Sequence, residues 1–172
     1  MKDVDACTPT NMGKLIVNDP TGLYPCSAEA IIKIIEYYQG SVDGLNICII
    51  NRSNVVGKPT AIILTNKGAT VSVLHSHTSE NTKRDYLKQA DIIVAAVPKK
   101  NFITLDMVRK DQMIVDASVI REKTLNQKMK SFGCCSDEIK NKTPVPGLGA
   151  ITSAMLAKNI LKACALQTNN FQ

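Results

Sequence analysis

Between residues 45 and 118, short apolar runs alternate with helical segments, and this alternation restricts the possible folds more than any other feature. Residues 45–50 read LNICII, a run that is apolar apart from Asn46, rich in β-branched isoleucine and typical of a strand that is buried on both faces. Further strands are predicted at 69–74, 91–97 and 112–118, with helices near 59–67, 80–89 and 104–109. Strands separated by helices form parallel sheets with right-handed crossovers. The sequence therefore predicts an α/β chain with a Rossmann-like parallel sheet and helices on both faces.

Two apolar helical segments flank this alternating region. Residues 27–39 follow a loop-like start, and residues 151–166 lie near the end of the chain, each with apolar side chains at helical spacing. One interpretation is that both helices cover the sheet. The other is that part of each apolar face packs against a further domain, and the sequence leaves both interpretations open.

Composition argues against several classes of function. The 172 residues suit one domain, and their net charge of +6 is scattered, without the basic runs or stacking aromatic residues that indicate nucleic-acid binding. The six cysteines include no CxxC pair and have neither zinc-site spacing nor the pattern of a secreted disulfide framework. The sequence shows no signal peptide and no apolar run of about 18 residues. We therefore expect no metal site, no membrane or nucleic-acid partner, and a cytoplasmic protein, with a mitochondrial location left open.

Residues 51–59, NRSNVVGKP, lie between the first predicted strand and the helix after it, where dinucleotide-binding folds place a phosphate loop. The segment contains one glycine, Gly57, instead of the three of the usual fingerprint. Asn51 is a residue type that tolerates a left-handed backbone. By itself the segment fits a cofactor loop and a purely structural strand-to-helix turn equally well.

The end of the second predicted strand indicates the type of cofactor. NAD-binding domains place an acidic residue there for the ribose hydroxyls, whereas residues 74–78 read LHSHT and the first acid is Glu80. Side chains that could instead surround a 2′-phosphate are Arg52, Ser53, Ser76 and His77. The charge pattern favours NADP over NAD. Each of the two histidines is individually better suited to an exposed or capping role than to catalysis.

Several motifs in register make the chain resemble a known family. RSNVVGKP (52–59), ATVSVLHSHT (69–78), ADIIVAAV (90–97), IVDAS (114–118) and the TPVPG segment (143–147) are similar to motifs of the methylenetetrahydrofolate dehydrogenase/methenyltetrahydrofolate cyclohydrolase family. KDVD (2–5) and YPCSAEAI (24–31) resemble further segments of that family in the same order. The resemblance extends over the whole chain, mainly to the family's C-terminal NAD(P)-binding domain. It implies oxidation of 5,10-methylenetetrahydrofolate with NADP, or in some members NAD, and hydrolysis of the methenyl product to the 10-formyl form.

The resemblance also implies two groups of site residues. The cofactor-binding group is Asn51, Arg52, Ser53, Ser76 and Val119. The folate-binding group is Asp5, Pro146, Gly147, Gly149 and Thr152. Residues 1–26 then correspond to a segment between the family's domains near the folate site. Residues 27–172, including the C-terminal helix, correspond to the NAD(P)-binding domain.

The resemblance further implies what this sequence lacks. The family's lysine, with a tyrosine four residues before it, and its glutamine lie on N-terminal segments without a counterpart here, so no catalytic residue is assigned. Positions that hold glycine in the family are occupied by Ala6, Asn51, Pro98 and Ser118, whose side chains intrude where the backbone approaches a cofactor. We expect a truncated or divergent family member, weakly active or inactive on its own. The alternative is a non-catalytic NADP-binding or partner-binding protein, as a homodimer or as a heterodimer with a full-length relative.

Overall fold

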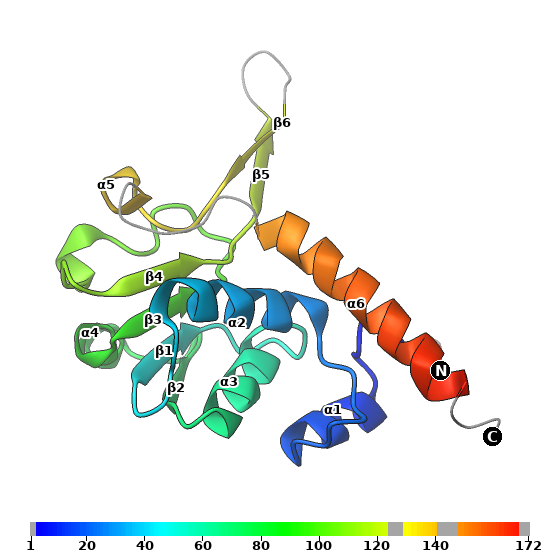
Figure 1. The fold of residues 1–172 in the computed structure, drawn as a ribbon. Helices are drawn as coiled ribbons and strands as arrows, with labels where there is room; N and C mark the ends of the chain where they lie inside the picture. The colour runs from blue at the N-terminus through cyan, green and yellow to red at the C-terminus, as the bar shows by residue number, and fades with distance from the viewer. Residues whose placement is uncertain (1–2, 124–128, 141–147, 169–172) are drawn as a thin grey trace.

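A four-stranded parallel sheet forms the centre of the protein in a computed structural model that describes residues 3–123, 129–140 and 148–168 (Figure 1). The strands are β1 (Asn46–Ile50), β2 (Thr70–Leu74), β3 (Ile92–Ala95) and β4 (Met113–Asp116), and their order is β2-β1-β3-β4. Ile50 is in register with Leu74 on one side and with Ala95 on the other, so β1, β2 and β3 end at the same edge. The predicted α/β fold with a Rossmann-like parallel sheet is confirmed.

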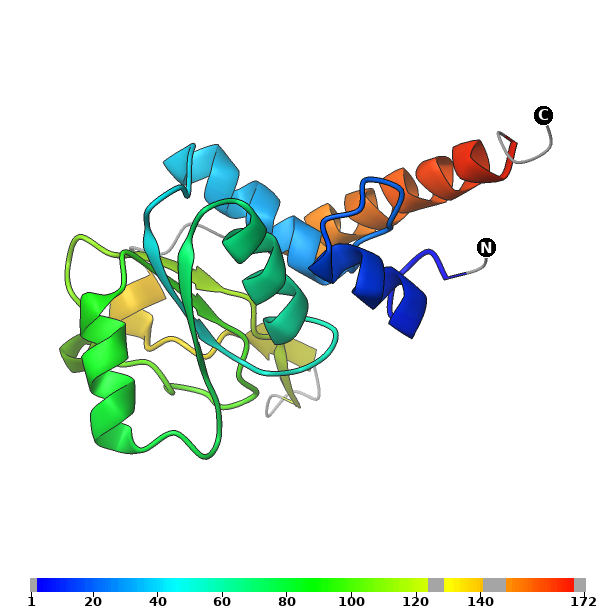
Figure 2. The same cartoon turned by 90° about the horizontal axis from the view of Figure 1, so that it is seen from below.

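Helices cover both faces of the sheet, and each face has its own apolar core. The helices are α2 (Cys26–Gln39) and α3 (Gly57–Asn66) on one side, and α4 (Glu80–Gln89) and α5 (Asp137–Lys140) on the other (Figures 1 and 2). Alternate residues of β1 contribute to different cores, because Ile47 and Ile49 pack on the α2 side and Cys48 and Ile50 on the α4 side. All four are almost inaccessible to solvent. This double burial explains the continuous apolar run in the sequence.

The start of the chain contains a helix, α1 (Pro9–Ile16), so the prediction of a loop-like start is wrong there. Thr8 caps the helix by accepting a hydrogen bond from the N–H of Asn11, and Pro9 occupies the first helical position, where no N–H is needed. The carboxylate of Asp3 supports this start, since it accepts from the N–H of Thr8 (2.9 Å) and from Nδ2 of Asn11 (2.8 Å). A helix of two turns carries too little apolar periodicity to be recognised, although Thr8-Pro9 is a helix-start signal.

Other elements also differ from expectation. The helix predicted at 104–109 is one 3₁₀ turn, η1 (Leu105–Met107). An antiparallel hairpin of β5 (Ile120–Lys123) and β6 (Met129–Phe132) follows β4, and the sequence does not predict it. The hairpin projects away from the parallel sheet in Figure 1. The C-terminal helix, α6 (Leu148–Thr168), extends beyond both predicted ends, 151 and 166.

α6 packs across α2 and continues past the sheet beside the N-terminal segment (Figure 1). Ala163 packs with Ala6 and Leu23 in a small apolar cluster, and polar side chains add hydrogen bonds to this attachment. Nδ2 of the buried Asn159 donates to the carbonyl oxygens of Val4 (3.0 Å) and Tyr24 (2.9 Å). Nζ of Lys162 donates to the carbonyl oxygen of Gly22 (2.6 Å). Residues at the two ends of the chain are thus joined by hydrogen bonds to the backbone.

The two flanking helices differ in how they use their apolar residues. α2 buries Ile31 and Ile35 completely against the sheet, so it covers the core, as the first interpretation expects. α6 packs Leu148 and Ile151 on the core, but three of its apolar side chains remain open to solvent, with Leu156 37%, Ile160 44% and Leu161 72% exposed. Among the helices in the described ranges, none is sufficiently long and apolar to cross a membrane. The apolar face of α6, defined by these three residues, therefore has no cover within the described parts of the chain.

Candidate functional site

A pocket of about 440 Å³ opens at the carboxyl ends of β1, β2 and β3. The chain passes from β1 to β2 on one side and then to β3 on the other side of β1, so the pocket lies where the strand order reverses. Open parallel sheets bind ligands at such switch points, because the loops that leave the strands diverge there. A smaller cavity of about 210 Å³ borders the first residues of β1 and β2, and its lining residues carry no charge. The larger pocket is therefore the candidate site.

Asn51 directly follows β1 and joins three parts of the pocket floor. Its Oδ1 accepts hydrogen bonds from the N–H groups of Ser53 (2.7 Å) and Gly57 (3.2 Å). Its Nδ2 donates to the carbonyl oxygen of Ala96, just beyond β3 (2.6 Å). The backbone of Asn51 is not left-handed, so the tolerance that the sequence suggested for this residue is not used. Asn51 instead acts through its side chain, which caps α3 and ties the ends of β1 and β3 together.

The start of α3 lies against the end of β1 because Gly57 has no side chain. A Cβ at this position would lie 2.1 Å from the carbonyl oxygen of Asn51. Oγ of Ser53 completes the cap by accepting from the N–H groups of Val56 (3.1 Å) and Gly57 (3.5 Å). A helix N-terminus with free N–H groups attracts anions. Here these groups already have partners, so a phosphate at this point competes with the side chains of Asn51 and Ser53.

Arg52 lines the pocket, with its side chain exposed. Within the described ranges its guanidinium has neither a hydrogen-bond nor an ion-pair partner, so its N–H donors are available to a ligand. Ser53, the next residue, does not line the pocket, and its hydroxyl is engaged in the cap of α3. Of these two predicted cofactor residues, only Arg52 thus faces the cavity.

A tight turn after β2 contributes hydroxyl and imidazole groups to the pocket. Thr78 fixes the turn, since its Oγ1 accepts from the N–H of His75 (3.0 Å) and its own N–H donates to the carbonyl oxygen of His75 (2.9 Å). His75, Ser76 and Thr78 all line the pocket. His77 does not, and its N–H donates to Nδ1 of His75 (3.2 Å). The turn therefore places the predicted Ser76 in the site, and His75 rather than His77 accompanies it.

Charged residues of α4 that sequence reasoning did not assign complete the pocket. Lys83 is only 6% exposed, and its Nζ lies 2.6 Å from Oε1 of Glu80 and 4.7 Å from the ring centroid of Phe102. The hydrogen bond and positive charge of Lys83 lower the pKa of Glu80, which keeps that carboxyl ionised at neutral pH. Lys83 precedes the buried Leu87 by four residues, so it shares the inward face of the helix. That spacing is the signal that could have revealed it.

The end of β4 approaches the pocket through Ser118. Its Oγ accepts from the N–H of Val97 (2.9 Å) and donates to the carbonyl oxygen of Ala95 (3.4 Å). The predicted cofactor residue Val119 follows, 63% exposed and outside the residues that line the pocket. The structure thus groups Asn51, Arg52 and Ser76, and it places Val119 at the periphery.

The predicted folate-binding residues that the structure describes, Asp5, Gly149 and Thr152, do not line this pocket. Asp5 is exposed beside the buried Cys26, and burial together with the hydrogen bond and charge of Asp5 raises the pKa of that thiol to about 12. Gly149 and Thr152 lie in the first turns of α6, where Oγ1 of Thr152 donates to the carbonyl oxygen of Leu148 (2.9 Å). The predicted residues Pro146 and Gly147 lie outside the described residues.

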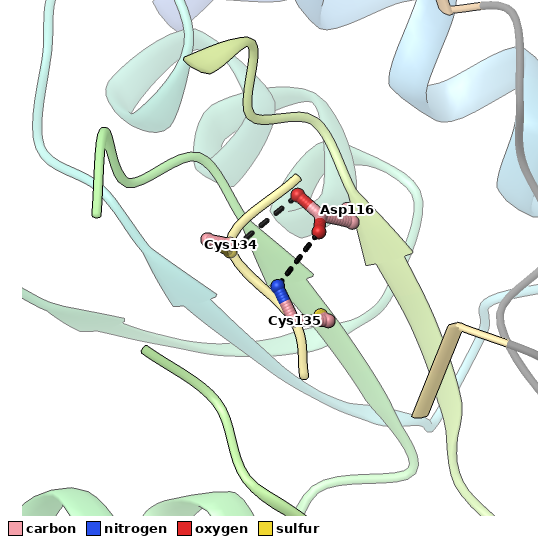
Figure 3. Close-up of side chains that lie close together, drawn as sticks. All are labelled: Asp116, Cys134 and Cys135. Carbon is pink, nitrogen blue, oxygen red and sulfur yellow. Dashed lines mark hydrogen bonds between the residues drawn. The ribbon is translucent and has the colours of Figure 1, made fainter. Parts of the chain in front are cut away.

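At the end of β4, a carboxylate and two thiols lie close together (Figure 3). Asp116 accepts hydrogen bonds from the N–H groups of Ser118 (3.0 Å) and Cys135 (2.9 Å) and from Sγ of Cys134 (3.4 Å). A Cβ on Gly133 would lie 2.1 Å from Oδ2 of Asp116. The hydrogen bond to Cys134, burial and the charge of Asp116 all raise the pKa of Cys135. Such donors can ligate a soft metal ion, but the carboxylate is already engaged and both thiols are buried, so we interpret the cluster as a structural bond between β4 and the 133–135 loop.

The strand order, the glycine-packed loop and the basic pocket at the switch point define a class. They are the features of a nucleotide-binding domain of the Rossmann type. The family model described as "Tetrahydrofolate dehydrogenase/cyclohydrolase, NAD(P)-binding domain" matches residues 25–168. The chain therefore belongs to this family, as its motifs predict.

Relatives and solved structures agree with this assignment. The "Bifunctional protein FolD" of Alkaliphilus oremlandii is 37% identical over 170 residues, which are 98% of this chain and 59% of that protein. That of Methanosarcina acetivorans is 42% identical over 161 residues, 93% of this chain and 54% of the relative. The crystal structure of the Campylobacter jejuni FolD enzyme superposes with a TM-score of 0.85 at 35% identity, over 96% of this chain and 59% of that one. The structure of the Trypanosoma brucei enzyme, complexed with NADP and an inhibitor, superposes with a TM-score of 0.85 at 27% identity. This match covers 94% of this chain and 57% of that one. This chain thus spans less than two thirds of the length of these proteins.

Proposed function

We propose that this chain binds NADP, and NAD more weakly, in the pocket at the carboxyl ends of β1, β2 and β3. The observation that carries the proposal is the guanidinium of Arg52, which has no partner among the described residues, in the same pocket as Ser76, in a domain of an NAD(P)-binding family. An arginine fork donates two parallel hydrogen bonds to phosphate oxygens. In this proposal Arg52 and Ser76 bind the 2′-phosphate, while Ser53 and Asn51 hold the loop and Val119 borders the cofactor from the far side.

The reaction that we propose for the assembled family member is the oxidation of 5,10-methylenetetrahydrofolate. Bound NADP would supply the hydride acceptor. The residues of this chain would bind and orient the cofactor, since the Asn51 cap and the Thr78 turn fix both loops before a ligand arrives. The folate would be held by Asp5, Pro146, Gly147, Gly149 and Thr152. We assign no catalytic residue to this chain, and we propose that it binds cofactor but turns substrate over weakly or not at all on its own.

The apolar face of α6 favours a second role, as a docking surface. Leu161 is 72% exposed beside the half-exposed Ile160, although apolar side chains of this size are normally covered. We propose that this face packs against the part of the family's length that this chain does not span, supplied by a full-length relative in a heterodimer. In sedimentation experiments, Leu161→Glu should abolish association with a full-length FolD enzyme, whereas Tyr37→Glu, at an exposed position on α2, should not. Equal association of both variants would contradict this role.

Calorimetric titration with NADP tests the cofactor proposal. We expect Arg52→Gln to weaken NADP binding at least about tenfold while NAD binding changes little, because only NADP carries the phosphate. Lys33→Gln removes the same charge from the outer side of α2, where Lys33 pairs with Glu36, and should leave both affinities unchanged. No NADP binding by the unaltered chain at millimolar concentration would refute the proposal. Turnover of methylenetetrahydrofolate by the isolated chain, if abolished by Asp5→Ala, would refute the proposed lack of independent activity.

A further inference from the structure

Lys83 is an unusual residue for the side of a helix, because its ammonium group is turned inward. It is 6% exposed, and its side chain lines the pocket together with Glu80 and Phe102. Lysine side chains are rarely buried unless a carboxylate pairs with them within the same environment. The partner here, Glu80, has a side chain that is 69% exposed. The buried cation is therefore paired with a carboxylate that lies mostly in water.

An ordinary helix ion pair does not account for this arrangement. Glu80 and Lys83 are three residues apart, and pairs at that spacing form on solvated helix faces without any burial. The face of the Phe102 ring, 4.7 Å from Nζ, gives the ammonium a second weak interaction but no hydrogen-bond acceptor. An ammonium group has three donors, and within the described ranges Glu80 is its hydrogen-bond acceptor. Lys83 therefore retains donor capacity on the side that faces the pocket.

The position of the Lys83–Glu80 pair relative to the other pocket residues indicates which groups of a ligand it can contact. Arg52 follows β1, Ser76 follows β2 and Lys83 comes from α4, and all three line one cavity of about 440 Å³. Glu80 is also the first acid after β2, the strand end from which NAD-binding domains direct a carboxylate to the ribose hydroxyls. The same pair thus offers a cation for a phosphate and an anion for a hydroxyl.

We propose that Lys83 and Glu80 form the selector between NADP and NAD in this pocket, an inference that rests on the proposed cofactor function. With NADP, Nζ of Lys83 leaves Glu80 and donates to the 2′-phosphate beside Arg52. With NAD, the pair stays intact, and the carboxylate of Glu80 accepts a hydrogen bond from the ribose 2′-hydroxyl. Glu80 therefore competes with the 2′-phosphate for Lys83 and accepts a hydrogen bond from the 2′-hydroxyl. Its removal changes the affinities for the two cofactors in opposite directions.

Calorimetric titration of the full chain with NADP and with NAD, at one fixed ionic strength, tests this selector. We expect Lys83→Gln to weaken NADP binding about tenfold and to change NAD binding less than about twofold, because a charge-assisted hydrogen bond to the phosphate is lost. We expect Glu80→Gln to strengthen NADP binding several-fold and to weaken NAD binding. Lys83→Arg should retain most of the preference for NADP. Lys88→Gln, an exposed lysine in the last turn of the same helix, is the matched control and should change neither affinity.

The different effects expected on the NADP and NAD affinities distinguish a role in cofactor selection from damage to the fold. A variant that merely loosens α4 weakens the binding of both cofactors together. Equal losses of affinity for NADP and NAD in Lys83→Gln would therefore overturn the role of Lys83. Unchanged or weaker NADP binding in Glu80→Gln would overturn the role of Glu80 as a competitor. If the unaltered chain binds NADP and neither substitution changes the ratio of the two affinities, the selector is wrong while the proposed function stands. If the unaltered chain binds no NADP, both are wrong.

Discussion

Replacing Gly57 with alanine perturbs the closest contact between α3 and the sheet. The added Cβ would lie 2.1 Å from the carbonyl oxygen of Asn51, more than 1 Å inside normal contact, so the start of the helix must retreat. Overpacking of this kind costs about 1–3 kcal/mol. The retreat also breaks the hydrogen bond from the Gly57 N–H to Oδ1 of Asn51, for about 1 kcal/mol. The better helix propensity of alanine returns about 1 kcal/mol. The last two terms cancel, so we expect the free energy of unfolding to fall by about 1–3 kcal/mol.

Urea unfolding followed by circular dichroism measures this loss, and Gly13→Ala is its control. Gly13 lies inside α1, and a Cβ there meets no heavy atom within 4 Å. That substitution should stabilise the chain by about 0.5–1 kcal/mol, since only helix propensity changes. If Gly57→Ala unfolds at the urea concentration of the unaltered chain, α3 does not approach β1 as closely as the structure has it. The reasoning about the loop would then be wrong.

Further expectations concern the carboxylates and thiols. Asp116→Asn should lower the free energy of unfolding by about 2 kcal/mol in the same assay, because an amide nitrogen would face backbone donors, whereas Asp111→Asn on the surface should change it little. Burial raises the pKa of Asp3, but hydrogen bonds from residues 7–11 outweigh it and lower the pKa from 3.8 to about 2. The ionised carboxylate therefore stabilises the folded chain above about pH 4, and this contribution is lost as the pH falls towards 2. Solvent screening reduces it to about 1 kcal/mol, and Asp3→Asn should remove that much of the change in the free energy of unfolding over this pH range. Iodoacetamide should label only Cys7 and Cys164 in the folded chain, and mass spectrometry that finds any of the buried thiols modified before unfolding would contradict their burial.

The sheet could be predicted from sequence because its signals are local. From Ile47 onward β1 is buried on both faces, so residues 47–50 contain no polar interruption, and β3 shows the same pattern. β2 is less buried, but it follows at the spacing that a strand-helix-strand unit requires. α1 was missed because two turns give little periodicity, and its stability depends on Asp3 and on contacts with other segments. The exposed apolar face of α6 could be read as a stripe, but whether anything covers a stripe depends on tertiary structure.

The site could be predicted only in part, because its residues come from three separate strand ends and one helix. Arg52 and Ser76 are predicted from their places after the first two strands and again from the family motifs, and both line the pocket. Lys83 could have been found only from its spacing of four residues to the buried Leu87, because lysine as a residue type indicates an exposed position. The use of the Asn51 side chain was also not predicted, because its hydrogen bond to Ala96 joins residues 45 positions apart in the chain. Local sequence thus identifies the loop, and the fold decides what the loop does.

The loop after β1 is stabilised without a ligand, and this changes how the pocket must bind an anion. The N–H groups of Ser53, Val56 and Gly57 donate hydrogen bonds to the side chains of Asn51 and Ser53. The start of α3 therefore has fewer free N–H donors for a phosphate than a helix N-terminus usually has. Attraction for a phosphate must then come mainly from the side-chain charges of Arg52 and Lys83. Charge interactions at an open pocket weaken as salt screens them, whereas backbone hydrogen bonds to a ligand depend less on salt. The preference for NADP over NAD that we propose for this chain should therefore decrease as ionic strength rises.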